Sequence, residues 1–342
     1  MKFNKLDKLI LIDGYMLLAE FVKEAVKDKD LEVVVFASKR HLAEKIYGQS
    51  LKKRLAGSKV VFYESADINN DKKFKQEVTK NSLGIAMGAP WIFSKKTVKF
   101  FAKNHLLDYM GVDLPRYRGG AHHTWRILHQ NNLGVLNMQV ITGSAAEFQK
   151  GKIIKREEFN FPAGTIKPLD CYNFMIKKEI NFLKDFIKQA KEGQSFELTG
   201  LKEEASSFYP FLSTKNSGLI NWHWLGREIY LFINAFDDPY PGASTYLNKR
   251  RIFLKDCQLL DEREKYHPFT SGIVIRKDKK GIYVAGLDNL LLIKKALNEQ
   301  GKNITDSIQL GDRLHTPYSK LDEAMTFRAI YDDRGLKNKK KL

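Results

Sequence analysis

The sequence is poor in cysteine and proline, and it has no long apolar run. Its 342 residues include only two cysteines, Cys171 and Cys257, and nine prolines. Two cysteines cannot build a disulfide framework, and no CxxC pair points to a zinc site, so we expect a reducing compartment and no bound metal. The early apolar run at residues 9–12 is too short for a signal peptide or a membrane span. We therefore expect a cytoplasmic protein with no membrane partner.

Two phosphate-binding signatures are also missing. No GxGxxG follows the first predicted strand at residues 8–12, and no Walker A loop occurs in the sequence. Neither a nicotinamide dinucleotide site nor a P-loop nucleotide site is therefore expected.

Acidic residues are in a clear minority. The chain has 58 Lys and Arg against 40 Asp and Glu, which gives a net charge of +18. A charge of this size favours polyanionic partners such as RNA, nucleotide-linked substrates or anionic lipid. Lysines spread over a solvated surface explain the same number equally well, so both interpretations stay open. With 43% hydrophobic residues, the chain is long enough for two folded domains.

Apolar runs alternate with helical periodicity in the first half of the chain. The runs predict strands at residues 8–12, 32–37, 59–63 and 83–88. Helical spacing follows the first strand, and a polar helical stretch is predicted from about Arg40 to Leu55. This alternation is typical of an α/β fold with a parallel, doubly wound sheet, whose ligands bind beyond the carboxyl ends of the strands.

The second half of the chain has a different character. A long amphipathic helix is predicted at residues 171–191, with Gly193 at its C-terminal cap, and another at 226–236. Short strands separated by turns then indicate a small β-barrel. The predicted parts are an α/β domain at 1–200, a connecting segment with a helix at 201–245, the barrel at 246–330 and a basic tail at 331–342.

The most informative segment is LPRYRGGAHHTWRIL, at residues 114–128. Its proline and its glycine pair predict a constrained turn, and Arg116 and Arg118 place two planar guanidinium donors beside it. Such donors suit a carboxylate or a phosphate. A solvated basic turn would have the same composition, so these residues alone leave both interpretations open.

This string closely resembles the loop of the formyltransferase superfamily that uses 10-formyltetrahydrofolate, which includes methionyl-tRNA formyltransferases and nucleotide-sugar N-formyltransferases. Residues 84–93 are similar to the family's strand and folate-facing loop, and residues 220–245 are similar to the segment before its C-terminal barrel. Residues 267–272 are similar to the start of that barrel. The resemblance implies a Rossmann-like formyltransferase domain followed by a small OB-like β-barrel.

The resemblance also implies a reaction and its binding segments. A formyl group would pass from 10-formyltetrahydrofolate to a primary amine, with a nucleotide-linked sugar favoured over methionyl-tRNA as the acceptor. Contact with the folate donor is implied for Met87, Gly88, Ala89, Pro90 and Trp91. Contact with the acceptor is implied for Arg116, Tyr117, Arg118, Gly119 and Gly120.

The chain departs from the family at all three catalytic positions. The family has an Asn seven residues and a His five residues before the loop proline, where this chain has Asp108 and Met110. The family's catalytic Asp corresponds to Gln149. Met110 is only a weak acceptor, Gln149 cannot take a proton, and Asp108 would oppose a developing oxyanion unless it is protonated.

Two histidines just past the loop offer a replacement base. His122 or His123 could accept a proton, with Asp108 as a carboxylate partner. Both histidines could equally well flank the start of a helix and do no chemistry.

Three hypotheses follow from these observations. The chain is a formyltransferase with a reworked catalytic set, or a relative that keeps a folate or nucleotide pocket without catalysis, or an RNA-binding module. The first two require Asp108, Met110 and Gln149 to converge at the floor of one cleft.

Overall fold

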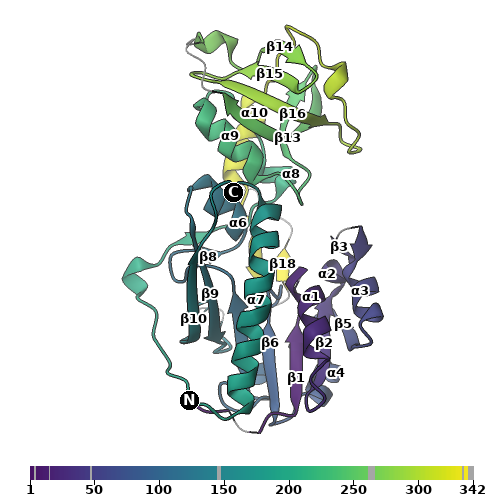
Figure 1. Cartoon of the computed structure of the whole chain (residues 1–342), viewed down its shortest axis with the longest axis vertical. Helices are drawn as coiled ribbons and strands as arrows, with labels where there is room; N and C mark the ends of the chain where they lie inside the picture. The colour runs from purple at the N-terminus through teal and green to yellow at the C-terminus, as the bar shows by residue number, and fades with distance from the viewer. Residues whose placement is uncertain are drawn as a thin grey trace.

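A computed structural model describes the chain at residues 1–3, 5–14, 16–46, 48–144, 148–260, 266–332 and 335–337. The chain forms a mixed α/β part, built on a largely parallel sheet, and a separate antiparallel sheet (Figure 1). This arrangement confirms the predicted fold class.

The larger sheet has seven strands in the order β10-β9-β7-β6-β1-β2-β5. Its parallel strands are β1 (Lys8–Ile12), β2 (Glu32–Ser38), β5 (Val61–Ser65), β6 (Ser82–Ala86) and β7 (Leu106–Met110). Two strands, β9 (Leu133–Val140) and β10 (Ile153–Asn160), extend it antiparallel beyond β7. The carboxyl ends of β1, β6 and β7 therefore lie side by side, at the edge where ligands bind in doubly wound sheets.

Helices cover both faces of this sheet because each has one apolar stripe. On one face, α1 (Met16–Ala25) and α7 (Pro168–Lys191) pack together over the strands with their buried side chains Leu18, Phe21, Val22, Phe182, Leu183 and Phe186. The other face is covered by α4 (Lys72–Glu77) and α5 (Lys95–Val98). The predicted helix at 171–191 is confirmed, and it begins three residues earlier, with Pro168 in its first turn.

The predicted helix from about Arg40 to Leu55 is wrong. The segment divides into α2 (Lys39–Ala43), the short strands β3 (Lys45–Ile46) and β4 (Gln49–Ser50), and α3 (Leu51–Gly57). Gly48 has a φ of 82°, which a helix does not accommodate. Ser50 then caps α3, because its hydroxyl accepts a hydrogen bond from the Lys53 amide at 3.3 Å.

The smaller sheet has five antiparallel strands in the order β12-β13-β16-β15-β14. These are β12 (Ala243–Leu247), β13 (Arg250–Leu260), β14 (Val274–Asp278), β15 (Gly281–Ala285) and β16 (Leu290–Leu297). The helix α9 (Gly226–Ala235), which confirms the prediction at 226–236, packs against β13. The chain continues through α10 (Tyr318–Thr326), β17 (Ile330–Asp332) and β18 (Gly335–Lys337). The rest of the predicted basic tail, at 333–334 and 338–342, lies outside the described residues.

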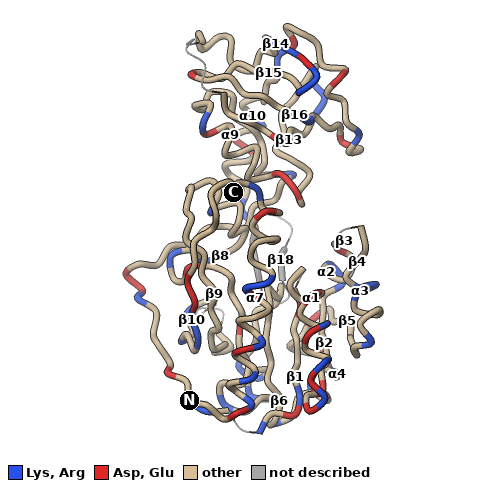
Figure 2. The backbone as a smooth tube through the Cα atoms, viewed as in Figure 1, with Lys and Arg blue, Asp and Glu red and all other residues tan. Residues whose placement is uncertain are grey.

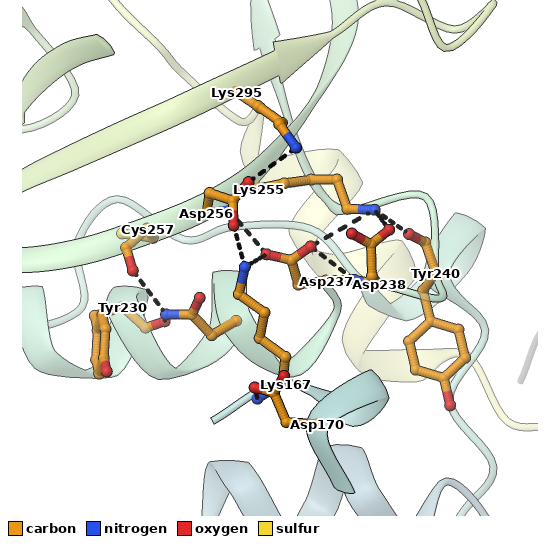
Figure 3. A network of polar contacts seen from close by, with 11 residues as sticks. Lys167, Asp170, Tyr230, Asp237, Asp238, Tyr240, Lys255, Asp256, Cys257 and Lys295 are labelled. Atoms are coloured by element: carbon orange, nitrogen blue, oxygen red, sulfur yellow. Dashed lines mark hydrogen bonds and ion pairs between the residues drawn. The ribbon is translucent and has the colours of Figure 1, made fainter. Parts of the chain in front are cut away.

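A buried charge network joins the two parts of the chain (Figure 3). Asp237, just after α9, is fully buried and pairs with Lys167 at 3.2 Å and with Lys255 at 3.6 Å. Its carboxylate also accepts a hydrogen bond from the Asp256 amide at 2.8 Å. Lys167 directly precedes α7, and Lys255 lies on β13. The Asp237 carboxylate, whose charge these two lysines balance, therefore joins the long helix to the smaller sheet.

Basic and acidic residues alternate over much of the larger part (Figure 2). Ion pairs join α7 to α1 and its C-terminal turn: Lys184 lies 3.0 Å from Glu24, and Lys191 lies 2.6 Å from Asp28. Several lysines on this surface are therefore neutralised by acidic neighbours, in exposed pairs that stabilise the fold little. No helix in the described ranges is long and apolar enough to cross a lipid bilayer.

Candidate active site

Asp108 lies on β7 near the carboxyl edge of the parallel sheet. Its neighbours across the strands are Ala86 of β6 and Gln139 of β9. The side chain is half-buried, and within the described part of the chain it has no hydrogen bond or ion pair. Burial alone raises the pKa of its carboxyl from 3.8 to about 7. Near neutral pH the side chain is therefore a mixture of the acid and the carboxylate.

The Asp108 side chain lines a cavity of about 60 Å³. Three aromatic rings and two amides also line it: Trp91, Phe93, Phe148, Gln139 and Gln149. This volume has room for about four water-sized groups. It is well below the roughly 300–1,000 Å³ of pockets that enclose a whole drug-sized ligand. A cavity of this volume has room for only the end of a larger molecule.

Gln149 connects this cavity to Met110. The Gln149 side-chain oxygen accepts a hydrogen bond from the Gly119 amide at 2.7 Å, and its Nε2 lies 3.8 Å from the Met110 sulfur. Met110 itself is buried in an apolar cluster with Val112 and Leu114. The structure therefore brings the three predicted catalytic residues together, since Asp108 and Gln149 line one cavity and Gln149 contacts Met110. Their chemical roles stay predictions.

Arg118 holds the loop in place. Its guanidinium is only 5% exposed, and its two terminal nitrogens bind the Glu203 carboxylate at 2.7 and 2.6 Å. The same group donates to the Ser206 hydroxyl at 2.6 Å, and its Nε donates to the Gln149 carbonyl at 2.9 Å. An anionic acceptor would have to displace Glu203 to reach Arg118. The geometry therefore favours a loop-holding role over the steering of an anionic acceptor.

The segment 203–211 covers the rest of the loop. Its strand β11 (Phe208–Tyr209) pairs in parallel with β8 (Arg118–Gly119). A Cβ atom at Gly119, whose φ is 110°, would lie 1.8 Å from the Tyr209 carbonyl oxygen, so this contact requires glycine. The Tyr117 ring stacks on the Tyr209 ring at 5.2 Å, and Gly120 donates its amide to the Tyr209 carbonyl at 3.1 Å.

Arg116 differs from Arg118 in its exposure. Its side chain is 59% exposed, and it forms one ion pair, with Asp113 at 3.3 Å. Of the two predicted guanidinium donors, Arg116 is the one that solvent reaches.

His122 and His123 lie at the start of α6 (His122–Leu128) and do not line the cavity. The His122 ring hydrogen-bonds to the Gly119 carbonyl, and burial lowers its pKa to about 4. The His123 ring stands edge-on to Tyr172 at 4.5 Å, and burial lowers its pKa to about 3. Both rings are therefore neutral at neutral pH. Their predicted role as a base stays a prediction.

The predicted folate-facing residues are only partly on the cavity. Ala89 and Trp91 line it, and the Trp91 indole nitrogen donates to the Ala66 carbonyl at 3.2 Å. Met87 is buried in the core and donates its amide to the Ile12 carbonyl at 3.1 Å. Gly88 has a φ of 90° with open space beside it, and Pro90 follows in the same turn.

Sequence reasoning missed Gln139 and Phe148. Gln139 lies opposite Asp108 on β9, and its Nε2 donates to the Gly151 carbonyl at 2.8 Å. No motif marks this position, and only the antiparallel pairing of β9 with β7 brings it to the cavity. Among the residues with described coordinates, no group of three or more His, Cys, Asp or Glu side chains could hold a metal ion.

The smaller part of the chain matches the model of a known protein family. A family model described as formyl transferase, C-terminal domain, matches residues 212–309. This range contains α9 and the whole five-stranded sheet.

Curated relatives extend the likeness. A methionyl-tRNA formyltransferase from Clostridium tetani is 28% identical over 194 residues, which cover 53% of this chain and 56% of the relative. A second, from Clostridium beijerinckii, is 24% identical and is covered over 59% of its length. The chain thus spans little more than half the length of these relatives.

Solved structures share the fold. An N-formyltransferase from Helicobacter canadensis, in complex with folinic acid and dTDP-3-aminofucose, has a TM-score of 0.61 at 15% identity, covering 84% of this chain and 99% of that one. HypX from Aquifex aeolicus, in complex with tetrahydrofolic acid, has a TM-score of 0.54 at 15% identity, covering 88% of this chain and 46% of that one. At these identities the likeness shows the fold alone.

Proposed function

We propose that this chain is a member of the formyltransferase superfamily that binds 10-formyltetrahydrofolate and transfers the formyl group to a primary amine. The observation that carries this proposal is the convergence of Asp108, Gln149 and Met110 beside the retained loop. The acceptor proposed first is an amino group on a nucleotide-linked sugar. The Helicobacter canadensis complex, which holds both a folate and such a sugar, supports that choice.

The cavity suits the one-carbon end of a folate. Trp91 and Phe93 offer flat apolar walls, and the side chain of Asp108 offers an uncommitted polar group among them. The volume of about 60 Å³ holds only this end of the donor, so the rest of the folate would lie outside the cavity. Only the formyl group and the atoms next to it would therefore lie inside the cavity.

The reaction sets clear demands on the side chains. The amine nitrogen attacks the formyl carbon, a new carbon–nitrogen bond forms, and the bond from that carbon to the donor nitrogen breaks. Negative charge develops on the formyl oxygen, and a proton leaves the attacking nitrogen and ends on the donor nitrogen. Met110 and Gln149 cannot exchange protons. Asp108 is the one group of the three that can.

A second candidate function is folate binding without catalysis. Met110 replaces the family histidine and contributes only a thioether, which is a weak acceptor and no donor. Removal of one oxyanion donor typically slows a reaction about 10²–10³-fold. A chain that lacks both family donors and the family acid could keep the pocket and lose the reaction.

Methionyl-tRNA is the other acceptor that the relatives suggest. The Clostridium tetani protein carries that name, and the net charge of +18 favours a polyanion. Binding of tRNA to this chain would weaken steeply with salt, because phosphate contacts release counterions.

The test uses the purified full chain with 10-formyltetrahydrofolate and three acceptors: a dTDP-linked amino sugar, methionyl-tRNA and a simple primary amine. Release of tetrahydrofolate that depends on one acceptor supports transfer. The triple variant Asp108→Asn, Met110→His and Gln149→Asp restores the family residues and should raise turnover at least about 100-fold. The exposed neighbour Lys150 gives a control, since Lys150→Ala lies outside the cavity and should leave turnover unchanged.

The outcomes separate the candidates. Folate binding with no turnover for any acceptor, and rescue by the triple variant, supports the non-catalytic relative. A chain that fails to bind folate at all overturns the proposed function.

A further inference from the structure

We propose that Asp108 acts as a neutral carboxylic acid whose O–H donates a hydrogen bond to the formyl oxygen of the bound folate. The site then binds its donor when Asp108 is protonated and loses affinity when the carboxyl ionises. This inference rests on the proposed function, because it assigns the group that replaces the family's amide and imidazole donors. It also makes proton uptake part of folate binding.

The position of Asp108 supports this role. The residue stands where the family has an asparagine, and a protonated carboxylic acid has nearly the shape of an amide. Its carboxyl lines the cavity between Ala86 on β6 and Gln139 on β9. A neutral acid can donate one hydrogen bond there, as the amide would, whereas a carboxylate can only accept.

The two amide side chains of the cavity are already engaged, and the hydroxyls of Thr142 and Ser144 also line it. The Gln139 Nε2 donates to the Gly151 carbonyl at 2.8 Å. The Gln149 side-chain oxygen accepts from the Gly119 amide at 2.7 Å, and its Nε2 faces the Gly119 carbonyl at 3.4 Å. Of the three cavity side chains with acidic or amide groups, Asp108 is the one that has no hydrogen bond within the described coordinates. Of these three side chains, it is therefore the one free to meet the formyl oxygen.

The surroundings favour the neutral form. Besides Asp108, every described residue that lines the cavity is uncharged, including those from β6, from the 89–93 loop and from β9 with the 141–144 turn that follows it. On the 148–151 side, Gln149 and Gly151 face the cavity, and the exposed Lys150 does not line it. On β7 itself, Tyr109 faces the opposite side of the sheet, where it binds Glu179 on α7. Glu147 directly precedes Phe148 in the sequence and lies outside the described residues.

Burial without a nearby cation raises the pKa of Asp108 to about 7. A ligand that requires the acid binds fully below this pKa. Its apparent dissociation constant then rises about tenfold for each pH unit above it. Affinity therefore falls as pH rises, which is the opposite of what a carboxylate that pairs with a cation would produce.

The experiment measures the dissociation constant of 5-formyltetrahydrofolate by titration calorimetry with the full chain at pH 6 and pH 8. We expect binding about tenfold weaker at pH 8, with uptake of a proton on binding at that pH. Asp108→Asn keeps a donor without a titratable group, so its dissociation constant should change less than twofold. That variant also reports any pH effect that comes from the ligand. Glu147→Gln is the control for the adjoining acid and should keep the tenfold change.

Three results would overturn the inference while folate binding survives. These are a flat pH dependence in the unmodified chain, an Asp108→Asn variant that still loses affinity at pH 8, and a pH dependence removed by Glu147→Gln instead. Carbon-13 NMR of the Asp108 carboxyl in the unliganded chain gives an independent measurement, and a titration near pH 4 would contradict the neutral acid. No folate binding at either pH overturns the proposed function and this inference together.

Discussion

The loop around Arg118 and the cavity wall around Asp108 adjoin each other, yet their charged side chains differ in how many hydrogen-bond partners they have. Arg118 makes hydrogen bonds to Glu203, Ser206 and Gln149, and solvent scarcely reaches it. Asp108 has no such partner in the described part of the chain, and burial raises its pKa. The loop is therefore held by many contacts at once, while the carboxyl of Asp108 has no partner among the described residues.

This contrast suggests what the departures from the family changed. Contacts that hold the loop run to Glu203, Ser206 and Gln149 and do not involve the Asp108 side chain. The residue at position 108 can therefore change while the loop keeps its form. Four predictions test whether the two regions are as independent as their contacts indicate.

The largest effect is expected at the loop. Gly119→Ala places a Cβ 1.8 Å from the Tyr209 carbonyl oxygen, at a φ of 110° that a side chain rarely adopts. We expect the free energy of unfolding to fall by about 4 kcal/mol or more, measured by urea denaturation.

Gly120→Ala is the matched control for this variant. Its added Cβ would meet the Phe211 Cβ at 3.3 Å, a much looser contact than at Gly119, and no backbone atom lies closer than 3.4 Å. The loss should be about 1 kcal/mol. Equal losses for the two glycines would show that the 203–211 segment does not hold the loop.

The next effect is a gain of stability at the cavity. A carboxyl whose pKa rises from 3.8 to about 7 on folding destabilises the fold once pH exceeds 3.8, and the full penalty is present above pH 7. Asp108→Asn removes it and should raise the free energy of unfolding by about 2–4 kcal/mol at pH 8. Urea unfolding at pH 4.5 should show a smaller gain. A gain that grows as pH falls would contradict the raised pKa.

A smaller loss is expected on the other face of the same strand. Tyr109 donates to Glu179 at 2.9 Å, and both side chains are buried. Tyr109→Phe removes the bond that lowers the pKa of Glu179, which burial already raises to about 7. We expect a loss of about 1–2 kcal/mol at neutral pH. A variant as stable as the unmodified chain would mean that this bond contributes nothing.

The smallest effect concerns Met110. The contact between the Gln149 amide and the Met110 sulfur, at 3.8 Å, is weak, and the rest of the side chain packs in an apolar cluster. Met110→Leu conserves volume and should cost less than about 1 kcal/mol. Folate binding should be unchanged, and a loss of binding would give the thioether a direct role.

Local patterns were enough to predict α7, α9 and four of the five parallel strands, all but β7. Each depends on apolar periodicity within about 20 residues, which a short window of sequence contains. The strand β10 was missed because its outer residues are polar and exposed, so no apolar run marks it. The helix predicted from Arg40 to Leu55 failed because Gly48 and the Ser50 cap outweigh the polar periodicity around them.

The contacts of the loop at the site also could not be predicted from a short stretch of sequence. Its sequence predicted a turn with two guanidinium groups, but the partner of Arg118 lies 85 residues further along the chain. The cavity likewise needs Gln139, which reaches Asp108 only because β9 pairs antiparallel with β7. Contacts between residues so far apart depend on how whole elements pack, and no short motif encodes them.

What the amino-acid sequence determined here is the chemistry available at each position: a carboxyl, a thioether and an amide where the family has an amide, an imidazole and a carboxyl. Whether Asp108 is an acid or a carboxylate, and whether Arg118 is free or engaged, was decided by the folded chain. Both properties depend on burial and on distant partners, because a charge loses its hydration only when other elements close around it.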